Sequence, residues 1–591
     1  MTFSNGKTER IAVDAVTNLA NKPGSYLIPN IPVGDKEVSF DGKISVFIDD
    51  SEKKESLEGN VPAQVKGTQV NCFHEGVRTF PLDMAHYRNY LKSNGVLLLV
   101  CEVNSAGDTK LFYKSLLPME LSKLIERFGH QKSRTVELRP LNETSLYTVC
   151  RKFLNEQQFQ SKVLVEKKPF PIDSFPKFTF TSLTFNPKHE STNRIFDHDF
   201  TVYGVLNEMR FPVNYGRVSS LATEGEKRFN INETSFDLEV NITIEEHKTT
   251  FIFENIFSLV VDEKDKMFHI RFLEFRSLKA QLKTIPFVIQ FLSGHPVEFE
   301  GGLLALNKDA RQVITELQEI CELEGALIEL KQVFQSLGID ENTIFQSADD
   351  ASLTSVFNFL IRAILHNDIK GLKEKPESGT LLSLEVGSRI VVLFFNPTNE
   401  QKLISAFSEE MLKIQCVINE KSGSTPYPHS VYSMLEVTSL AQGININPNI
   451  IFESFEQFDP FLNEGAFRHT NDFCLKCISA YDLSDNLGLL ELASRIYKKY
   501  TGTPDDSNYL ISLINQYQIG KRKNGTLTEE EREQLYQYKI KAVSTDNVEL
   551  LFCINVLLEN KFEAEIMYNQ FKKEQQELYQ TLPIFKLYRK L

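Results

Sequence analysis

The chain has 591 residues, 41% of them hydrophobic and 24% charged, with a formal net charge of −14. This length is too great for one hydrophobic core, so several domains are expected, and the acidic balance argues against a protein that coats nucleic acid indiscriminately. The eight cysteines form no disulfide framework, no apolar run approaches the ~18 residues of a membrane span, and residues 1–7 lack the apolar core of a signal peptide, so we expect a cytoplasmic protein with no membrane partner.

The charge is unevenly distributed along the chain. Residues 1–150 contain 18 Lys and Arg and 18 Asp and Glu, so residues 151–591 carry the whole net charge of −14. A nucleic-acid contact is therefore expected in the neutral first quarter of the chain.

The first 150 residues alternate between helical and extended patterns. Residues 8–21 have apolar positions at helical spacing, with Thr8 as the expected N-cap. A hairpin is expected next, because the apolar runs 44–48 and 61–66 flank a charged tip at 49–60. The remaining elements are a helix over 82–92, an apolar strand over 95–103, a strand over 110–114 and a helix over 118–128. This order predicts a small α/β domain over residues 1–150.

The rest of the chain divides into three further regions. Period-two alternation, as in 236–244, predicts an antiparallel β-rich domain over residues 151–306. Residues 307–454 form a mixed region of helices and strands, and residues 455–591 are helical. The last two predicted helices are compatible with a tetratricopeptide-like hairpin. The predicted fold class is an α+β multidomain protein.

The predicted hairpin gathers polar side chains on one face. With the tip centred in the charged run 52–55, Asp41 faces Lys66 and Lys43 faces Gln64. Opposed residues of antiparallel strands project to the same side, and residues two apart share a face. These four side chains are therefore expected together, with Asp41 and Lys66 side by side; a bulge in either strand would change this register.

Asp41, Gln64 and Lys66 are residue types that phosphodiester cleavage uses. A carboxylate and an amide oxygen are hard ligands suited to Mg²⁺ or Mn²⁺, so Asp41 and Gln64 are candidate metal ligands. The Lys66 ammonium is expected to position the attacking water or to stabilise negative charge in the transition state. Glu9, from the preceding helix, shares a face with apolar core positions and is expected to add a second carboxylate to the metal or to its water shell.

The order of these residues resembles the PD-(D/E)XK nuclease superfamily, in the variant in which Gln replaces the acidic residue of the third motif. More narrowly, residues 1–150 resemble a bacterial domain family of unknown function that is often fused to long C-terminal regions in phage-defence proteins. The resemblance implies a restriction-endonuclease-like α/β fold, a divalent metal and the site residues Glu9, Asp41, Gln64 and Lys66. The matching segments are the first helix, 40–44, 63–68, the strand 96–103 and 111–114.

Each of these residues also has an ordinary structural explanation. Gln64 and Lys66 fit an edge strand whose polar side chains oppose aggregation. Glu9 fits a favourable charge in the first turn of a helix, and Asp41 fits a simple Asp-Gly turn. Asp35 competes with Asp41 for the metal role if the hairpin begins earlier.

Other motifs favour structural roles. Cys474 and Cys477 stand in a helical pattern with no second metal-binding motif, so they are expected to be buried thiols rather than zinc ligands. The Asp-His-Asp segment 197–199 is metal-like in composition, but strand alternation would direct His198 away from the two carboxylates, and a surface segment is expected. The basic cluster 520–523 is expected in a solvated loop between helices.

These patterns lead to the hypothesis of a cytoplasmic, Mg²⁺-dependent endonuclease whose N-terminal domain cuts DNA, while residues 151–591 sense a trigger or restrain cleavage. The resemblance implies bacterial anti-phage defence with a phage or host protein as the trigger, and a homo-oligomer is compatible with the sequence. The rival hypothesis is a non-catalytic interaction or sensor protein with a nuclease-like docking domain, motivated by the acidic charge and by Gln64, a poorer metal ligand than Glu. Cleavage of RNA, such as tRNA, is a third alternative.

Overall fold

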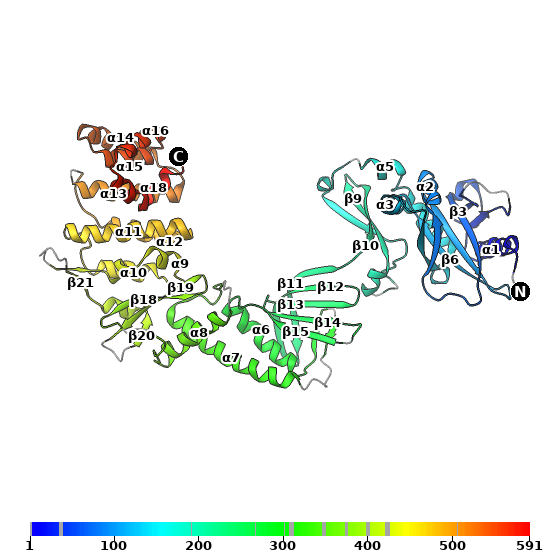
Figure 1. Cartoon of the computed structure of the whole chain (residues 1–591), viewed down its shortest axis with the longest axis horizontal. Coiled ribbons are helices and arrows are strands. Elements are labelled where there is room, and N and C mark those ends of the chain that lie inside the picture. The colour runs from blue at the N-terminus through cyan, green and yellow to red at the C-terminus, as the bar shows by residue number, and fades with distance from the viewer. Residues whose placement is uncertain are drawn as a thin grey trace. The chain divides into compact units, whose positions relative to one another are not determined.

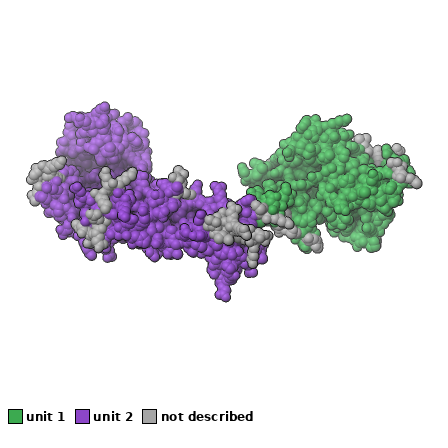
Figure 2. All heavy atoms as spheres, turned by 60° about the horizontal axis from the view of Figure 1, so that its bottom comes forward, with its two compact units in different colours: residues 1–223, 243–249, 261–267 green, residues 224–242, 250–260, 268–591 purple. Residues whose placement is uncertain are grey.

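The computed structural model describes residues 3–34, 39–168, 170–188, 190, 192–265, 267–300, 302–305, 312–345, 350–372, 376–397, 402–419, 426–504 and 506–591. Asp35 lies outside these residues. The chain separates into two compact units: unit 1 comprises residues 1–223, 243–249 and 261–267, and unit 2 comprises the rest (Figure 2). None of the helices that the described residues form combines the length and the apolar content needed to cross a membrane.

Unit 1 contains a seven-stranded mixed sheet flanked by helices (Figure 1). Its elements are α1 (Asn5–Ala20), β1 (Leu27–Asn30), β2 (Gly42–Phe47), β3 (Leu57–Gln69), β4 (Arg78–Asp83), α2 (Met84–Lys92), β5 (Val96–Val103), β6 (Thr109–Leu116), α3 (Pro118–Phe128), β7 (Ser133–Pro140), α4 (Leu146–Gln157) and α5 (Lys162–Lys167). The strand order is β1-β2-β3-β5-β6-β7-β4. Strand β3 is antiparallel to β2 and parallel to β5, and β6 is antiparallel to β5.

The sheet of unit 1 has a hydrophobic core on each face. Every residue of β5 is buried, as expected for a parallel strand covered on both sides. On one face, Val16 of α1 belongs to the same buried cluster as Val65 of β3. On the other face, Tyr90 of α2 clusters with Leu98 of β5. Because strand side chains alternate, Gln64, the register partner of Leu98, projects towards the α2 side of the sheet.

The predicted hairpin register is wrong by two residues. Lys43 pairs with Pro62 rather than with Gln64, and extending this register places Asp41 across from Gln64 and not from Lys66. The second strand begins four residues earlier than predicted and a bulge interrupts the ladder near the tip, so the turn is shorter and off-centre. A slip of two residues leaves every side chain on its predicted face, because the strand period is two.

Helix α1 begins earlier than predicted. Its N-cap is Ser4, whose hydroxyl accepts the backbone N–H of Lys7 at 3.3 Å, so Thr8 lies inside the helix and is not the cap. The first turn carries no acidic residue, and Glu9 follows it. A helix-dipole contribution from the first turn therefore does not account for Glu9.

A second, three-stranded antiparallel sheet belongs to the same unit. It consists of β8 (Lys177–Thr181), β9 (Asp199–Leu206) and β10 (Met209–Arg217) in the order β10-β9-β8. Helices α3 and α5 contact β10, so this sheet packs against the elements of the first 167 residues.

Unit 2 begins with β-strands and ends in helices. One helix, α6 (Leu278–Leu292), was not predicted in the β-rich range. The strands before and after it are β11 (Leu221–Ile231), β12 (Thr234–Ile244), β13 (Lys248–Phe253), β14 (Phe257–Asp262), β15 (Met267–Phe272), β16 (Val297–Phe299) and β17 (Gly302–Leu304), which form a second seven-stranded sheet.

The C-terminal half completes a mixed α/β chain with a helical end, as predicted at this level. Its elements are α7 (Gln312–Leu337), α8 (Asp350–Leu365), β18 (Thr380–Val386), β19 (Arg389–Asn396), β20 (Lys402–Ser405), β21 (Cys416–Ile418), β22 (Tyr427–His429), α9 (Val437–Gln442), α10 (Pro448–Glu456), α11 (Glu464–Ser484), α12 (Leu487–Tyr497), α13 (Ser507–Asn524), α14 (Glu529–Ser544), α15 (Val548–Leu557), α16 (Lys561–Gln570), α17 (Lys573–Thr581) and α18 (Pro583–Tyr588).

Two local predictions in this half can be checked directly. Cys474 and Cys477 are free, fully buried thiols on α11, as predicted. The basic cluster 520–523 is not a loop but the last part of α13. There Arg522 lies 2.8 Å from Asp482, and Lys521 donates to the carbonyl of Leu557, so these charges are used within the fold.

Candidate functional site

Asp41 and Gln64 are in direct contact where strand β2 begins. Gln64 Nε2 donates to Asp41 Oδ2 at 2.7 Å, and the backbone N–H of Val65 donates to the same oxygen at 2.8 Å. Asp41 is 3% exposed and Gln64 is 2% exposed. The Asp41 carboxylate thus accepts an N–H of β3 where the pairing between β2 and β3 ends. Two hydrogen bonds hold its orientation.

Tyr90 on helix α2 extends this contact into a chain of hydrogen bonds. Its side chain is fully buried, and its hydroxyl donates to Gln64 Oε1 at 3.2 Å. Burial and the negative charge of Asp41 raise the pKa of Tyr90, so the hydroxyl stays protonated. The Gln64 amide is thereby oriented with its nitrogen towards Asp41 and its oxygen towards Tyr90.

Gly42 determines where the Asp41 backbone lies. Its φ is +154°, and a Cβ at this position would lie 2.1 Å from the carbonyl oxygen of Asn30 on β1. Only glycine therefore allows β1 and β2 to approach each other here. The Asp-Gly pair marks the start of β2, and the interpretation of it as a simple turn is wrong.

Lys66 lies on β3 two residues beyond Gln64 and on the same face of the sheet. Its side chain is half-buried. No ion pair or side-chain hydrogen bond joins Lys66 to any other residue that the structure describes, so the predicted neighbour relationship with Asp41 is wrong. Within that part of the chain, its ammonium remains accessible to an anionic ligand.

Glu9 comes from the other side of the sheet. Helix α1 packs on the face opposite to Gln64 and Lys66. Thr8 O lies 2.8 Å from the place that a Cβ on Gly67 would occupy, so the missing side chain at Gly67 lets the helix approach β3 closely. Glu9 therefore lies next to the strand segment that carries Lys66, on a different face from the Asp41–Gln64 contact.

The donor groups around Asp41 limit what kind of metal site is possible. Asp41 lines an open surface cavity of about 530 Å³ together with Phe40, Lys43 and Ser93. The described residues contain no group of three His, Cys, Asp or Glu side chains that could hold a metal ion. The predicted ligand role of Gln64 does not fit this arrangement, because its amide oxygen accepts from Tyr90 and its nitrogen faces Asp41. Asp41 alone fits a weakly held Mg²⁺ that keeps most of its water ligands, rather than a closed protein cage.

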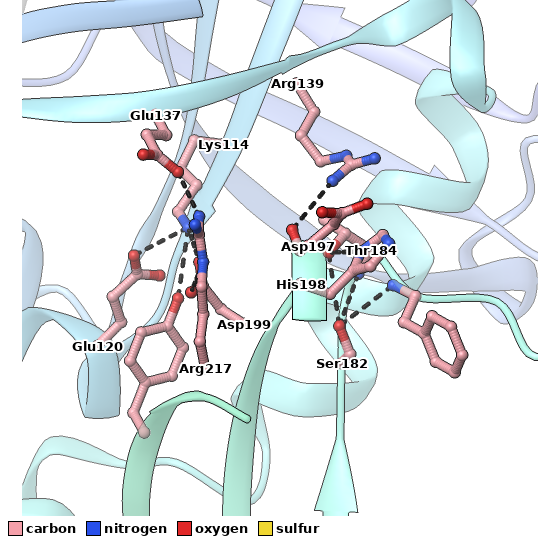
Figure 3. Close-up of polar contacts among 12 residues, drawn as sticks. Lys114, Glu120, Glu137, Arg139, Ser182, Thr184, Asp197, His198, Asp199 and Arg217 are labelled. Carbon is pink, nitrogen blue, oxygen red and sulfur yellow. Dashed lines mark hydrogen bonds and ion pairs between the residues drawn. The ribbon is translucent and has the colours of Figure 1, made fainter. Parts of the chain in front are cut away.

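A second polar cluster joins the two sheets of unit 1 (Figure 3). Lys114 Nζ on β6 lies 2.9 Å from Glu120 Oε1 on α3 and 3.1 Å from Asp199 Oδ2 on β9. Tyr215 OH accepts from Lys114 Nζ at 3.3 Å, and Arg217 Nε lies 3.2 Å from Asp199 Oδ1. The cations and carboxylates of this ion cluster neutralise one another, so it is a structural joint between sheets.

The titration of the ion cluster agrees with this structural role. Burial raises the pKa of Glu120, and Lys114 offsets only part of that effect. Burial alone would raise the pKa of Asp199, but the charge and hydrogen bond of Lys114 hold it below its ordinary value. Burial alone would lower the pKa of Lys114, but the two acids raise it, so the lysine remains charged.

The Asp-His-Asp segment is only partly at the surface: Asp197 is exposed, as expected, whereas His198 is buried. His198 is 1% exposed, and its Nδ1 lies 2.8 Å from Thr184 Oγ1. Figure 3 shows the two side chains next to each other. Burial lowers the pKa of His198, which favours the neutral ring. Asp199 belongs to the ion cluster, while the Asp197 backbone accepts from Arg139.

Sequence reasoning missed two residues that shape this part of unit 1. Tyr90 is one of several aromatic residues in its helix, and nothing in the sequence distinguishes it as the partner of Gln64. Glu102 did carry a signal, because it is the one charged residue in the otherwise apolar strand β5. It is fully buried and lies 3.0 Å from Arg78 NH1.

In comparisons with known proteins, no family model, no curated protein and no solved structure matches the chain.

Proposed function

We propose that the protein is a metal-dependent nuclease that cleaves DNA phosphodiester bonds through a site in unit 1 containing Asp41, Gln64 and Lys66; Glu9, on the opposite face of the sheet, is not part of this site. The observation that carries the proposal is the direct Asp41–Gln64 hydrogen bond, with Lys66 two residues farther along the same face. The resemblance of residues 1–150 to the Gln-x-Lys variant of PD-(D/E)XK nucleases supports the same residues. Residues beyond unit 1 would then sense a trigger in anti-phage defence.

Each side chain has a role that its contacts support. Tyr90 and Val65 N–H hold the Gln64 amide and the Asp41 carboxylate in fixed orientations, so little reorganisation is needed when substrate binds. Lys66, which pairs with no described residue, would bind a phosphate oxygen and stabilise the negative charge that gathers there in the transition state. Asp41 would hold the divalent cation, and Gln64, whose amide nitrogen donates to Asp41, would orient that carboxylate. A bound Mg²⁺ would supply Lewis-acid stabilisation of the phosphate oxygens.

The direct test is cleavage by the purified full-length protein of plasmid, linear DNA and total RNA, with and without Mg²⁺. We expect Mg²⁺-dependent DNA cleavage by the natural protein and loss of at least ~10²-fold in Asp41→Asn and Lys66→Ala, because each removes a charge that acts in the transition state. Lys54→Ala is the matched control: Lys54 is exposed at the hairpin tip, at the far end of β3, and cleavage should be unchanged. Equal cleavage by Asp41→Asn and the natural protein would refute the proposal.

The rival function is a non-catalytic docking domain. One observation favours it. Asp41 Oδ2 already accepts two hydrogen bonds, from the Gln64 amide and from Val65 N–H, as it would in a purely structural contact at the end of a strand pair. Isothermal titration with Mg²⁺ and Mn²⁺ separates the two, since the nuclease predicts a binding heat that Asp41→Asn removes. The RNA arm of the cleavage assay decides between DNA and RNA as substrate.

A further inference from the structure

An exposed histidine in unit 1 is held by a fully buried carboxylate. His74 Nδ1 lies 2.5 Å from Glu102 Oε1, and the backbone N–H of His74 donates to Glu102 Oε2 at 2.9 Å. Arg78 NH1 lies 3.0 Å from Glu102 Oε1 and balances the charge of the carboxylate. The Glu102 side chain is 0% exposed, whereas the His74 side chain is 56% exposed. A ligand can therefore reach the His74 ring, and the buried Glu102 carboxylate determines the orientation of that ring.

The contact with Glu102 also selects the tautomer of the ring. An ionised carboxylate can only accept hydrogen bonds, so Nδ1 of His74 must carry the proton that lies between them. In the neutral ring, Nε2 then holds a lone pair and can accept a proton. An imidazole oriented in this way by a carboxylate is the arrangement that general bases use in hydrolysis.

The ring is not needed to hold its own loop. The backbone N–H of His74 is fixed by Glu102, and its carbonyl oxygen accepts from Lys110 Nζ. These two contacts anchor the segment between β3 and β4 without the imidazole. The third contact, from Nδ1, orients a titratable side chain that the anchoring of the loop does not require.

The position of this histidine relates it to the site proposed above. In the parallel β3–β5 register, Lys66 is opposite Val100 and Thr68 is opposite Glu102, so Lys66 and Glu102 project from the same face. With a rise of about 3.3 Å per residue and a strand spacing of about 4.8 Å, their Cα atoms are about 8 Å apart. His74, held by Glu102, therefore belongs to the face of the sheet from which Lys66 projects.

We propose that His74 is the general base of the phosphodiester hydrolysis, with Glu102 as its positioning residue; this rests on the proposed nuclease function. Nε2 of His74 takes a proton from water as the water oxygen forms a bond to phosphorus. The bond between phosphorus and the leaving oxygen breaks, and that oxygen takes a proton from solvent. The imidazolium then releases its proton to solvent, which restores the neutral ring.

The charged groups around the ring set the expected pH dependence. Glu102 on β5 and Arg78 on β4 face it and balance each other, and Lys110 on β6 contacts its backbone carbonyl. A general base must be neutral to accept a proton, so a cleavage step that uses an imidazole base should slow at acidic pH. The acid side of the pH–rate profile is thus a property of His74 that a structural role would not produce.

The experiment measures kcat and KM against pH for the full-length protein on linear DNA with Mg²⁺. His74→Asn is the key variant, because the Asn amide can still donate to Glu102 but has no group at the place of Nε2. We expect kcat to fall ~10²–10⁴-fold with KM unchanged and with the acid-side dependence lost. Glu102→Gln should reduce kcat less and keep a pH dependence. His130→Asn, at an exposed histidine after α3, is the control and should cleave normally.

The outcomes separate this inference from the function on which it rests. His74 is not the base if His74→Asn keeps its kcat within about threefold, or if it loses activity while the acid side of its pH–rate profile is unchanged. In either case the nuclease proposal still stands as long as Asp41→Asn is inactive. If the natural protein cleaves neither DNA nor RNA, the nuclease proposal and the catalytic step fall together. A melting temperature measured for each variant identifies losses of activity that come from unfolding. If His74→Asn is unfolded, His74→Gln replaces it, and normal cleavage by a folded His74→Gln counts against His74 as the base.

Discussion

Two lysines of unit 1 lie on neighbouring parts of one sheet and have opposite surroundings. Lys114, on β6, is 15% exposed and is held by the carboxylates of Glu120 and Asp199. Lys66, on β3, is half-buried and pairs with no residue among those described. A lysine whose charge is matched inside the fold serves the fold, whereas one that stays unmatched is available to a ligand.

The acids near these lysines differ in the same way. Asp199 is bound by charged partners, and these hold its pKa below its ordinary value. Asp41 receives hydrogen bonds at Oδ2 from two uncharged groups, the Gln64 amide and Val65 N–H. These two donors orient the Asp41 carboxylate through Oδ2.

The largest expected effect on stability comes from removing Lys114, the lysine whose charge is matched by carboxylates inside the fold. Lys114→Ala leaves Glu120 without its cation and should cost about 3–5 kcal/mol of the free energy of unfolding of unit 1. Lys66→Ala, in contrast, should change that free energy by no more than about 0.5 kcal/mol. Hydrogen exchange of β6, β9 and β10 in increasing urea measures both. Equal losses of stability in the two variants would show that the carboxylates around Lys114 do not set it apart from Lys66.

A backbone change beside Asp41 should have the next largest effect. Gly42→Ala introduces a Cβ that would meet the carbonyl of Asn30 and should destabilise unit 1 by about 1–3 kcal/mol and displace Asp41. The control is Gly107→Ala, where φ is also positive at +91° but nothing lies within 4 Å of the new Cβ. Urea unfolding together with the cleavage assay should show a larger loss at Gly42 in both measurements.

A smaller effect is expected from the hydroxyl that orients Gln64. Tyr90→Phe leaves Gln64 Oε1 without its donor and should cost about 1–2 kcal/mol. Tyr87→Phe is a matched control on the same helix, since its equally buried hydroxyl donates to the carbonyl of Arg134. Both variants should lose similar stability in urea unfolding, but only Tyr90→Phe should slow cleavage. An equal slowing would show that the hydroxyl of Tyr90 has no special role.

The smallest expected effect is that of mild acid on the stability of the ion cluster. The raised pKa of Glu120 means that its contribution is present below its ordinary value of 4.5 and is lost as pH rises through the folded value. The lowered pKa of Asp199 means that its contribution is present above its ordinary value of 3.8 and is lost as pH falls below it. Protection factors for amide exchange in β9 and β10 should therefore rise slightly as pH falls from 7 towards 4.5, through Glu120, and decrease below 3.8, as the contribution of Asp199 is lost. Lower protection at pH 6 than at pH 7 would contradict this.

The helices and strands around the site were largely predictable from local pattern. The apolar run of β5 and the helical spacing of α2 and α3 appear in the sequence because side-chain periodicity is set by the backbone geometry of each element. The shared face of Gln64 and Lys66 follows from the period of two alone. It survived an error of two residues in the predicted hairpin register for the same reason.

The partners of these residues were decided by tertiary structure. Which atom meets Asp41 depends on an off-centre turn and a bulge, and the contact between Tyr90 and Gln64 joins residues 26 positions apart. Lys114 looks no different from Lys66 in the sequence, yet residues 85 and more positions away complete its cluster. The sequence determined which side chains lie on which face of a strand, because the alternation of side chains is a local property. Packing between distant elements decided which charges are matched and which remain open to a ligand. Only a folded chain brings those groups within hydrogen-bonding distance.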